Sequence, residues 1–227
     1  MFLSKLNQEG FSILENIFTT AEIEAILQAL SKKDLAQQFG VRYFLKEHSD
    51  LIPLVFTLKF KQLIQAIDAK AFVIKSIYFD KPPHANWIVN WHQDIAINVE
   101  GKTADTAYTK WRTAKGRTAV QPPIEVLENI FTLRIHLDDC TIQNGALQVI
   151  PKSHLNGVIR VSELSQSEKA NATVCEVKQG GVLAIKPLIF HASKRVENLK
   201  SRRVLHLEFT SEKLADGVNW LEQLEFN

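Results

Sequence analysis

Phe72 to Asp94 reads FVIKSIYFDKPPHANWIVNWHQD, and this stretch decides the fold. Its β-branched and aromatic residues predict one strand over 72–79, and the Lys81-Pro82-Pro83 run breaks it. A second strand is expected from Ile88 to Asp94. Because the chain before residue 70 has mainly helical patterning, this stretch marks the point where it becomes a β protein.

The remaining patterns extend the same architecture in both directions. Gly10 to Glu15 predicts a short strand, and Thr19 with Glu22 forms a capping box that begins a helix. Short packed helices are expected between residues 31 and 70. Further strands are expected at 173–177, 182–185 and 203–209. Many short strands with helices largely at the ends indicate a mainly β fold with flanking helices. We expect one domain over 1–227, an antiparallel double-stranded β-helix (jelly roll, cupin-like).

Leu133 to Asp139, LRIHLDD, alternates between apolar and polar residues. Arg134, His136 and Asp138 therefore share one face of a strand, which lines either a wet cavity or the exterior. Asn144-Gly145 is a preferred pair for a type I′ turn, so a hairpin with 146–150 is expected. A closing helix is expected around 216–224.

Composition narrows the classes of partner. The chain has 227 residues, with 27 basic and 25 acidic side chains and a formal charge of +2. So small a charge does not indicate a nucleic-acid groove or a membrane-surface role, and a small-molecule substrate is expected. Two cysteines in no CxxC spacing fit a reducing compartment, and no signal peptide or membrane span is recognisable, so a cytoplasmic location is expected. Nothing in the sequence indicates an oligomeric state.

The segment 100–123 is long, polar and basic, and it follows the second strand directly. Long loops in compact domains are often lids over a functional site. We weigh two interpretations equally: a basic lid that recognises an anionic substrate, and a solvated surface connection.

Trp91-His92-Gln93-Asp94 holds the first candidate site residues. In an extended strand His92 and Asp94 lie on one face, about 6.6 Å apart along the backbone, while Trp91 and Gln93 face the scaffold. A histidine and a carboxylate form two thirds of a 2-His-1-carboxylate triad, which binds Fe(II) and leaves coordination positions open. An isolated HxD also arises by chance, so downstream residues must decide.

His191 ends a later apolar run, and Arg202 and Arg203 begin the next strand. An antiparallel neighbour returning past His191 would bring one guanidinium near a metal, where it could pair with a carboxylate in bidentate fashion. A shift of one residue in strand phase exchanges which arginine points inward, so both stay candidates.

These motifs together resemble the phytanoyl-CoA dioxygenase family of Fe(II)/2-oxoglutarate oxygenases. The resemblance extends from about Phe72 to Phe209 and rests on an ordered set of segments: WHQD, NGALQVIPKSH, GGVLAIKPLIFHAS and RRVLHLEF. Lys152 departs from the family, which often has glycine in that turn.

The resemblance implies a role for particular residues. His92, Asp94 and His191 match the iron ligands, and Arg202 matches the arginine that pairs with the distal carboxylate of 2-oxoglutarate. Ser193 matches a serine that assists this arginine. Arg134 falls where some members carry a large side chain beside the cosubstrate.

The resemblance also implies the reaction. Fe(II), 2-oxoglutarate and O₂ would together hydroxylate an unactivated C–H bond of a small molecule, releasing succinate and CO₂. Family halogenases replace the metal carboxylate with a small residue, so Asp94 favours hydroxylation. Two alternatives are a non-catalytic jelly-roll binding protein and a cupin-type metal enzyme that uses no 2-oxoglutarate.

Overall fold

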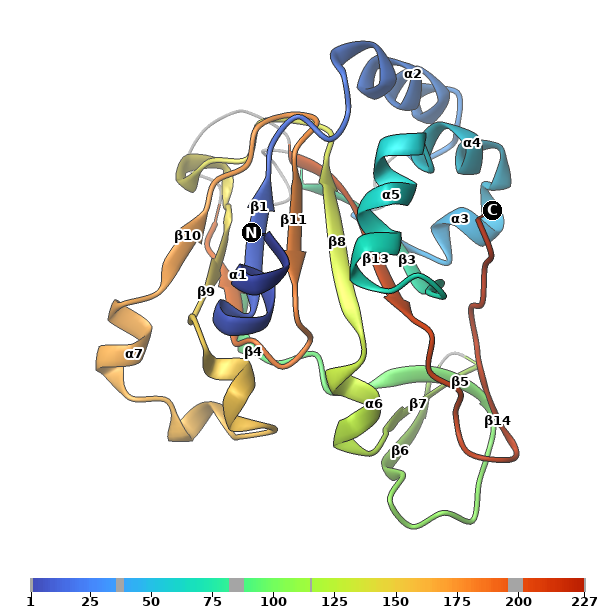
Figure 1. The fold of residues 1–227 in the computed structure, drawn as a ribbon, viewed down its shortest axis with the longest axis vertical. Coiled ribbons are helices and arrows are strands. Elements are labelled where there is room, and N and C mark those ends of the chain that lie inside the picture. The colour runs from blue at the N-terminus through green and yellow to red at the C-terminus, as the bar shows by residue number, and fades with distance from the viewer. Residues whose placement is uncertain (1, 36–38, 82–87, 115, 196–201, 227) are drawn as a thin grey trace.

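The structure, a computed structural model, describes residues 2–35, 39–81, 88–114, 116–195 and 202–226 (Figure 1). The expected Pro82-Pro83 break and Trp87 lie outside the described residues. The rest of the opening stretch forms strands β3 (Phe72–Lys81) and β4 (Val89–His92). Strand β4 is shorter than expected, and Asp94 lies two residues beyond its end.

The larger sheet has six antiparallel strands. Its order is β1 (Phe11–Leu14), β11 (Val182–Ile185), β8 (Phe131–His136), β13 (Arg202–Thr210), β3 and β2 (Gly40–Arg42). Strand β13 lies between β8 and β3, so its inward side chains reach the middle of the fold.

A smaller sheet lies opposite and contains β10 (Thr173–Cys175), β9 (Leu147–Val149), β12 (His191–Ser193) and β4 in that order. The two sheets form the mainly β, jelly-roll architecture expected from the sequence. Apolar side chains from both sheets pack between them at one end, among them Phe11, Leu183, Val149 and Ile189. The other end contains the polar cavity described below.

Helices cover the outer face of the larger sheet, where α2 and α5 lie beside β8 and β13 (Figure 1). The Thr19–Glu22 capping box begins α2 as expected. The α-helices are α1 (Phe2–Glu9), α2 (Thr20–Ser31), α3 (Phe44–Glu47), α4 (Ile52–Val55), α5 (Leu58–Ile67), α6 (Ile124–Glu128) and α7 (Gln166–Ala170). Short 3₁₀ helices span Ser49–Leu51, Ile142–Asn144, Ser153–Asn156 and Val161–Glu163.

The alternation predicted for β8 is present, and both of its faces are buried. Leu133 and Ile135 pack under the helices, whereas Arg134 and His136 are buried on the other face. The polar face is therefore internal, which selects the cavity from the two alternatives, cavity or exterior, that the sequence left open.

The expected hairpin through Asn144-Gly145 is wrong, because β8 and β9 belong to different sheets. The Asn144 side chain instead accepts from the Thr141 amide at 2.7 Å and donates to the Asp139 carbonyl at 2.7 Å. These bonds stabilise a 3₁₀ turn, which Gly145 ends with a φ of 80°. The local Asx chemistry of Asn144 outweighs its preference for a hairpin turn.

The expected long loop over 100–123 is also wrong. Strands β6 (Thr109–Ala114) and β7 (Arg117–Gln121) form a hairpin in a third sheet, of order β14 (Val218–Trp220), β5 (Ile97–Gly101), β7, β6. Every residue of strand β6 except the half-buried Trp111 is exposed, so its sequence shows no apolar alternation. The expected closing helix is replaced by β14 (Val218–Trp220), which pairs with β5.

In the part of the chain that the structure describes, no helix combines the length and the apolar character needed to span a bilayer.

Candidate metal and cosubstrate site

The smaller sheet brings the two candidate histidines together. His92 is the last residue of β4 and His191 the first of β12, and the antiparallel register places them opposite each other. The Asp94 amide donates to the Pro187 carbonyl at 2.9 Å, which holds the chain just past β4. Side chains far apart in sequence thus share one edge of the sheet.

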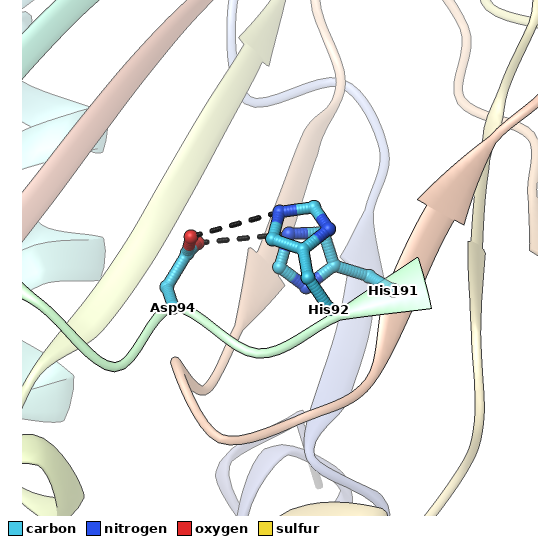
Figure 2. Close-up of side chains that lie close together, drawn as sticks. All are labelled: His92, Asp94 and His191. Atoms are coloured by element: carbon cyan, nitrogen blue, oxygen red, sulfur yellow. Dashed lines mark ion pairs between the residues drawn. The ribbon is translucent and has the colours of Figure 1, made fainter. Parts of the chain in front are cut away.

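The Asp94 carboxylate points toward both imidazoles (Figure 2). Its oxygens lie 3.8 Å from His92 Nε2 and 3.6 Å from His191 Nε2. One potential ligand atom from each of these three residues lies within 4.8 Å of the other two. Among the described residues, they form the cluster that could hold a metal ion. Two imidazole nitrogens and one carboxylate on one side of a point are the donor set of a facial triad.

Backbone carbonyls set the tautomer of both rings. His92 Nδ1 lies 2.8 Å from the Asn90 oxygen, and His191 Nδ1 lies 3.0 Å from the Ile189 oxygen. A carbonyl only accepts, so each Nδ1 carries the proton and donates it. Each Nε2 therefore presents a lone pair toward Asp94, as a metal ligand must.

The charge states also suit a divalent metal. Burial alone would raise the pKa of Asp94, but His191 and then Lys75 outweigh it and lower that pKa to about 2. Burial lowers the pKa of His191 to about 4, although Asp94 acts in the opposite direction. At neutral pH the carboxylate is ionised and the imidazole is neutral, and both can bind a cation without first losing a proton.

Gln93 lies between the two ligands and faces away from them. Its Nε2 donates to the carbonyls of Leu188 at 2.7 Å and Gly157 at 2.8 Å, and its Oε1 accepts from the Ile159 amide at 3.1 Å. Trp91, on the same side, packs against Ile150, Leu164 and Phe190. Both belong to the scaffold that supports the ligand positions.

Arg202 and Ser193 line the same cavity as the triad. The Arg202 guanidinium donates to the Gly145 carbonyl at 2.7 Å and, more weakly, to Cys140 Sγ at 3.9 Å. Its buried Nε and the buried Ser193 hydroxyl have no partner among the described residues. Two unused donors lining one cavity suit a carboxylate that accepts from both.

Arg203 has the opposite environment. Its Nε and a terminal nitrogen donate to Asp138 at 2.9 and 2.6 Å, a bidentate ion pair outside the cavity lining. The strand phase of β13 therefore directs Arg202 inward and Arg203 away.

The cavity has a volume of about 200 Å³. Apolar side chains supply part of its wall: Ile77, Phe79, Val89 and Leu147. Arg134 also lines it, as expected. His136 is buried on the same face of β8 but does not line the cavity. No described residue of 100–123 lines this cavity, but Lys110 of that segment lines a second pocket together with His92.

A family model described as phytanoyl-CoA dioxygenase matches residues 6–204. The chain belongs to the phytanoyl-CoA dioxygenase family. Among curated relatives, a phytanoyl-CoA dioxygenase of Arabidopsis thaliana is 27% identical over 73% of this chain and 53% of its own length. A phytanoyl-CoA dioxygenase domain-containing protein 1 of Mus musculus is 25% identical over 66% of this chain and 49% of its own. The chain thus spans about half the length of the curated relatives it matches.

Solved structures share the fold. EvdO2 from Micromonospora carbonacea var. aurantiaca, complexed with 2-oxoglutarate, has a TM-score of 0.67 and 16% identity, over 95% of this chain and 93% of its own. EctD from S. alaskensis, with bound Fe, has a TM-score of 0.67 and 15% identity, over 92% and 75%. The α-ketoglutarate-dependent epimerase SnoN has a TM-score of 0.67 and 12% identity, over 92% and 79%.

Sequence reasoning missed four charged or polar cavity residues of this phytanoyl-CoA dioxygenase family member: Arg42, Lys75, His206 and Glu208. Glu208 pairs with Lys75 at 2.7 Å and accepts from His206 at 3.0 Å. The signal was present in RRVLHLEF, because alternation places His206 and Glu208 on the face of Arg202.

Proposed function

We propose that this chain is an Fe(II)- and 2-oxoglutarate-dependent oxygenase that hydroxylates an unactivated C–H bond of a small molecule. The observation that carries the proposal is the pairing of two features in one cavity. A His-Asp-His triad with free Nε2 lone pairs shares that cavity with the unpartnered donors of Arg202 and Ser193. Family membership supports the same function.

Each side chain has a defined part in the proposal. His92, Asp94 and His191 would hold Fe(II). The bound iron would supply the chemistry by which O₂ oxidises both 2-oxoglutarate, to succinate and CO₂, and the substrate C–H bond. Arg202 and Ser193 would bind the distal carboxylate of the cosubstrate. Arg134 forms the adjoining wall.

The protein contributes position and a restricted environment. Gln93 holds the backbone between two ligands, so their spacing is set before any metal arrives. The apolar wall of Ile77, Phe79, Val89 and Leu147 would keep water away from the reacting carbon of the substrate. A C–H bond of the substrate would then be the group within reach of the bound iron.

The test uses anaerobic protein with Fe(II) and 2-oxoglutarate, which should develop a weak visible charge-transfer band. His191→Ala should abolish the band, because one imidazole ligand is lost. His154→Ala is the matched control, since the His154 ring contacts the Asn7 carbonyl at 3.0 Å, outside the cavity lining.

Exposing the same mixture to air and measuring succinate then distinguishes an enzyme from a binding protein. We expect slow succinate release from wild-type protein and a hydroxylated product when a screened metabolite stimulates that release. A band without any succinate would indicate a binding protein, and absence of both would contradict the proposed site.

A further inference from the structure

The cavity contains more positive charge than the proposed reaction uses. Four cationic side chains line it, Arg42, Lys75, Arg134 and Arg202, against the two carboxylates Asp94 and Glu208. On the proposed function, the charges of a divalent metal and a dianionic cosubstrate cancel. Two positive charges therefore stay in excess.

Specific contacts show which cations are surplus. Lys75 is paired with Glu208 at 2.7 Å, and Arg202 is the proposed partner of the cosubstrate. Arg134 has no carboxylate partner among the described residues. Its terminal nitrogen instead contacts His206 Nδ1 at 2.8 Å.

The His206 ring adds no negative charge. Its Nε2 lies 3.0 Å from Glu208 Oε1, which can only accept, so Nε2 carries the proton. Nδ1 is then the lone pair that accepts from Arg134. Burial lowers the pKa of His206, and Arg134 adds to this effect, although the hydrogen bond to Glu208 acts in the opposite direction.

Arg134 is 7% exposed, and its buried Nε has no partner in the part of the chain that the structure describes. The Phe79 ring, 5.6 Å from the guanidinium, compensates only weakly. A buried guanidinium without a counter-ion is unfavourable, and a cavity that retains one is arranged to receive an anion.

We propose that the primary substrate is a small organic carboxylate whose anionic group pairs with Arg134. Arg42, exposed on edge strand β2, supplies the second surplus charge at the cavity opening and attracts the same anion. This inference rests on the proposed function. It adds the substrate class, with the arginines of β8 and β13 serving two different anions.

The test titrates Zn(II)-loaded protein by calorimetry. The first titration adds 2-oxoglutarate alone. The second adds, to the protein saturated with 2-oxoglutarate, straight-chain monocarboxylic acids of four to eight carbons and their primary amides. We expect at least one acid to bind tenfold or more tightly than its amide.

Variants assign that preference to a residue. Arg134→Gln should remove the preference for the acid, while weakening 2-oxoglutarate far less than Arg202→Gln does. Arg112→Gln, the same charge change on exposed strand β6, is the matched control and should retain the preference.

The outcomes separate the two proposals. If 2-oxoglutarate binds but no acid binds better than its amide, the substrate class is wrong and the oxygenase proposal stands. The same holds if Arg134→Gln weakens 2-oxoglutarate as strongly as Arg202→Gln. Failure of 2-oxoglutarate to bind in the first titration overturns both.

Discussion

Arg202 and Arg203 are adjacent in sequence and have opposite environments. Arg202 is buried in the cavity, and its Nε has no partner within the described part of the chain, whereas Arg203 makes a bidentate ion pair with Asp138. Neighbouring residues of a strand face opposite sides, so only one of them can serve the cavity. This difference makes the pair a controlled comparison.

We predict that Arg202→Gln raises the Kd for 2-oxoglutarate about 10- to 100-fold, because a charged hydrogen-bonding partner contributes about 1.5–3 kcal/mol. Arg203→Gln should change that Kd less than about threefold and lower the free energy of unfolding by about 1 kcal/mol. Calorimetry on Zn(II)-loaded protein and chemical denaturation measure the two effects. A larger loss of affinity in Arg203→Gln would show that the strand phase is misassigned.

At the scale of elements, the end of β4 is held from outside the site. Gln93 connects it to the 157–159 segment and to the chain before β12 through three hydrogen bonds. His92 and Asp94, the proposed metal ligands on either side of Gln93, point the other way. Their spacing therefore depends on a side chain that does not itself line the triad's cavity.

We predict that Gln93→Leu lowers metal affinity about 10- to 100-fold, the effect typical of losing an outer partner of a metal site. The leucine has a similar size but leaves the two carbonyls and one amide unsatisfied. Competition with a chromophoric chelator measures the affinity. Gln148→Leu, on β9 of the same sheet, is the control, and equal losses in both variants would contradict a positioning role for Gln93.

At the scale of the whole molecule, helices cover one face of the larger sheet and the smaller sheet lies against the other. Ionisable side chains of the larger sheet are therefore buried, and His136 is one of them. His136 is 2% exposed, and neither ring nitrogen has a partner among the described residues. Burial, then Arg134 and Arg202, lowers the pKa of His136 well below its usual value. In weakly acidic solution the folded protein therefore keeps this ring neutral, whereas the same ring in the unfolded chain binds a proton.

The expected consequence is a loss of stability in acid. A histidine whose pKa is lowered by folding does not reduce the free energy of unfolding above its ordinary pKa of about 6.5. As the pH falls below that value, it reduces this free energy progressively, because the unfolded chain binds the proton more readily. The slope for one such group approaches about 1.4 kcal/mol per pH unit. The free energy of unfolding of metal-free His136→Leu, measured by denaturation at pH 7 to 5, should fall less steeply with decreasing pH than that of the metal-free wild type. The two slopes should differ by up to this amount. Parallel curves for the two proteins would contradict the assignment.

Much of this could be predicted from local sequence. Alternation in LRIHLDD and RRVLHLEF determines which side chains share a face, and the capping box at Thr19 determines where α2 begins. Such features depend on residues a few positions apart. The order of WHQD, His191 and the arginine pair was sufficient to indicate a metal and cosubstrate site.

Other features escaped because their cause is not local. Strand β6 is exposed except at the half-buried Trp111 and has no apolar pattern, so only its pairing with β7 identifies it. Asn144-Gly145 fits two turn types, and the Asp139 and Thr141 backbone groups select the 3₁₀ form.

The sequence by itself thus determined the jelly-roll class, the candidate ligands and their order along the chain. Only the tertiary structure decided that His92 meets His191 across β4 and β12, that Arg202 rather than Arg203 faces inward, and that Arg134 has no carboxylate partner among the described residues. The physical reason is that alternation assigns a side chain to a face, whereas sheet pairing and packing decide what lies opposite that face. The balance of charges in the cavity depends on sheet pairing and packing.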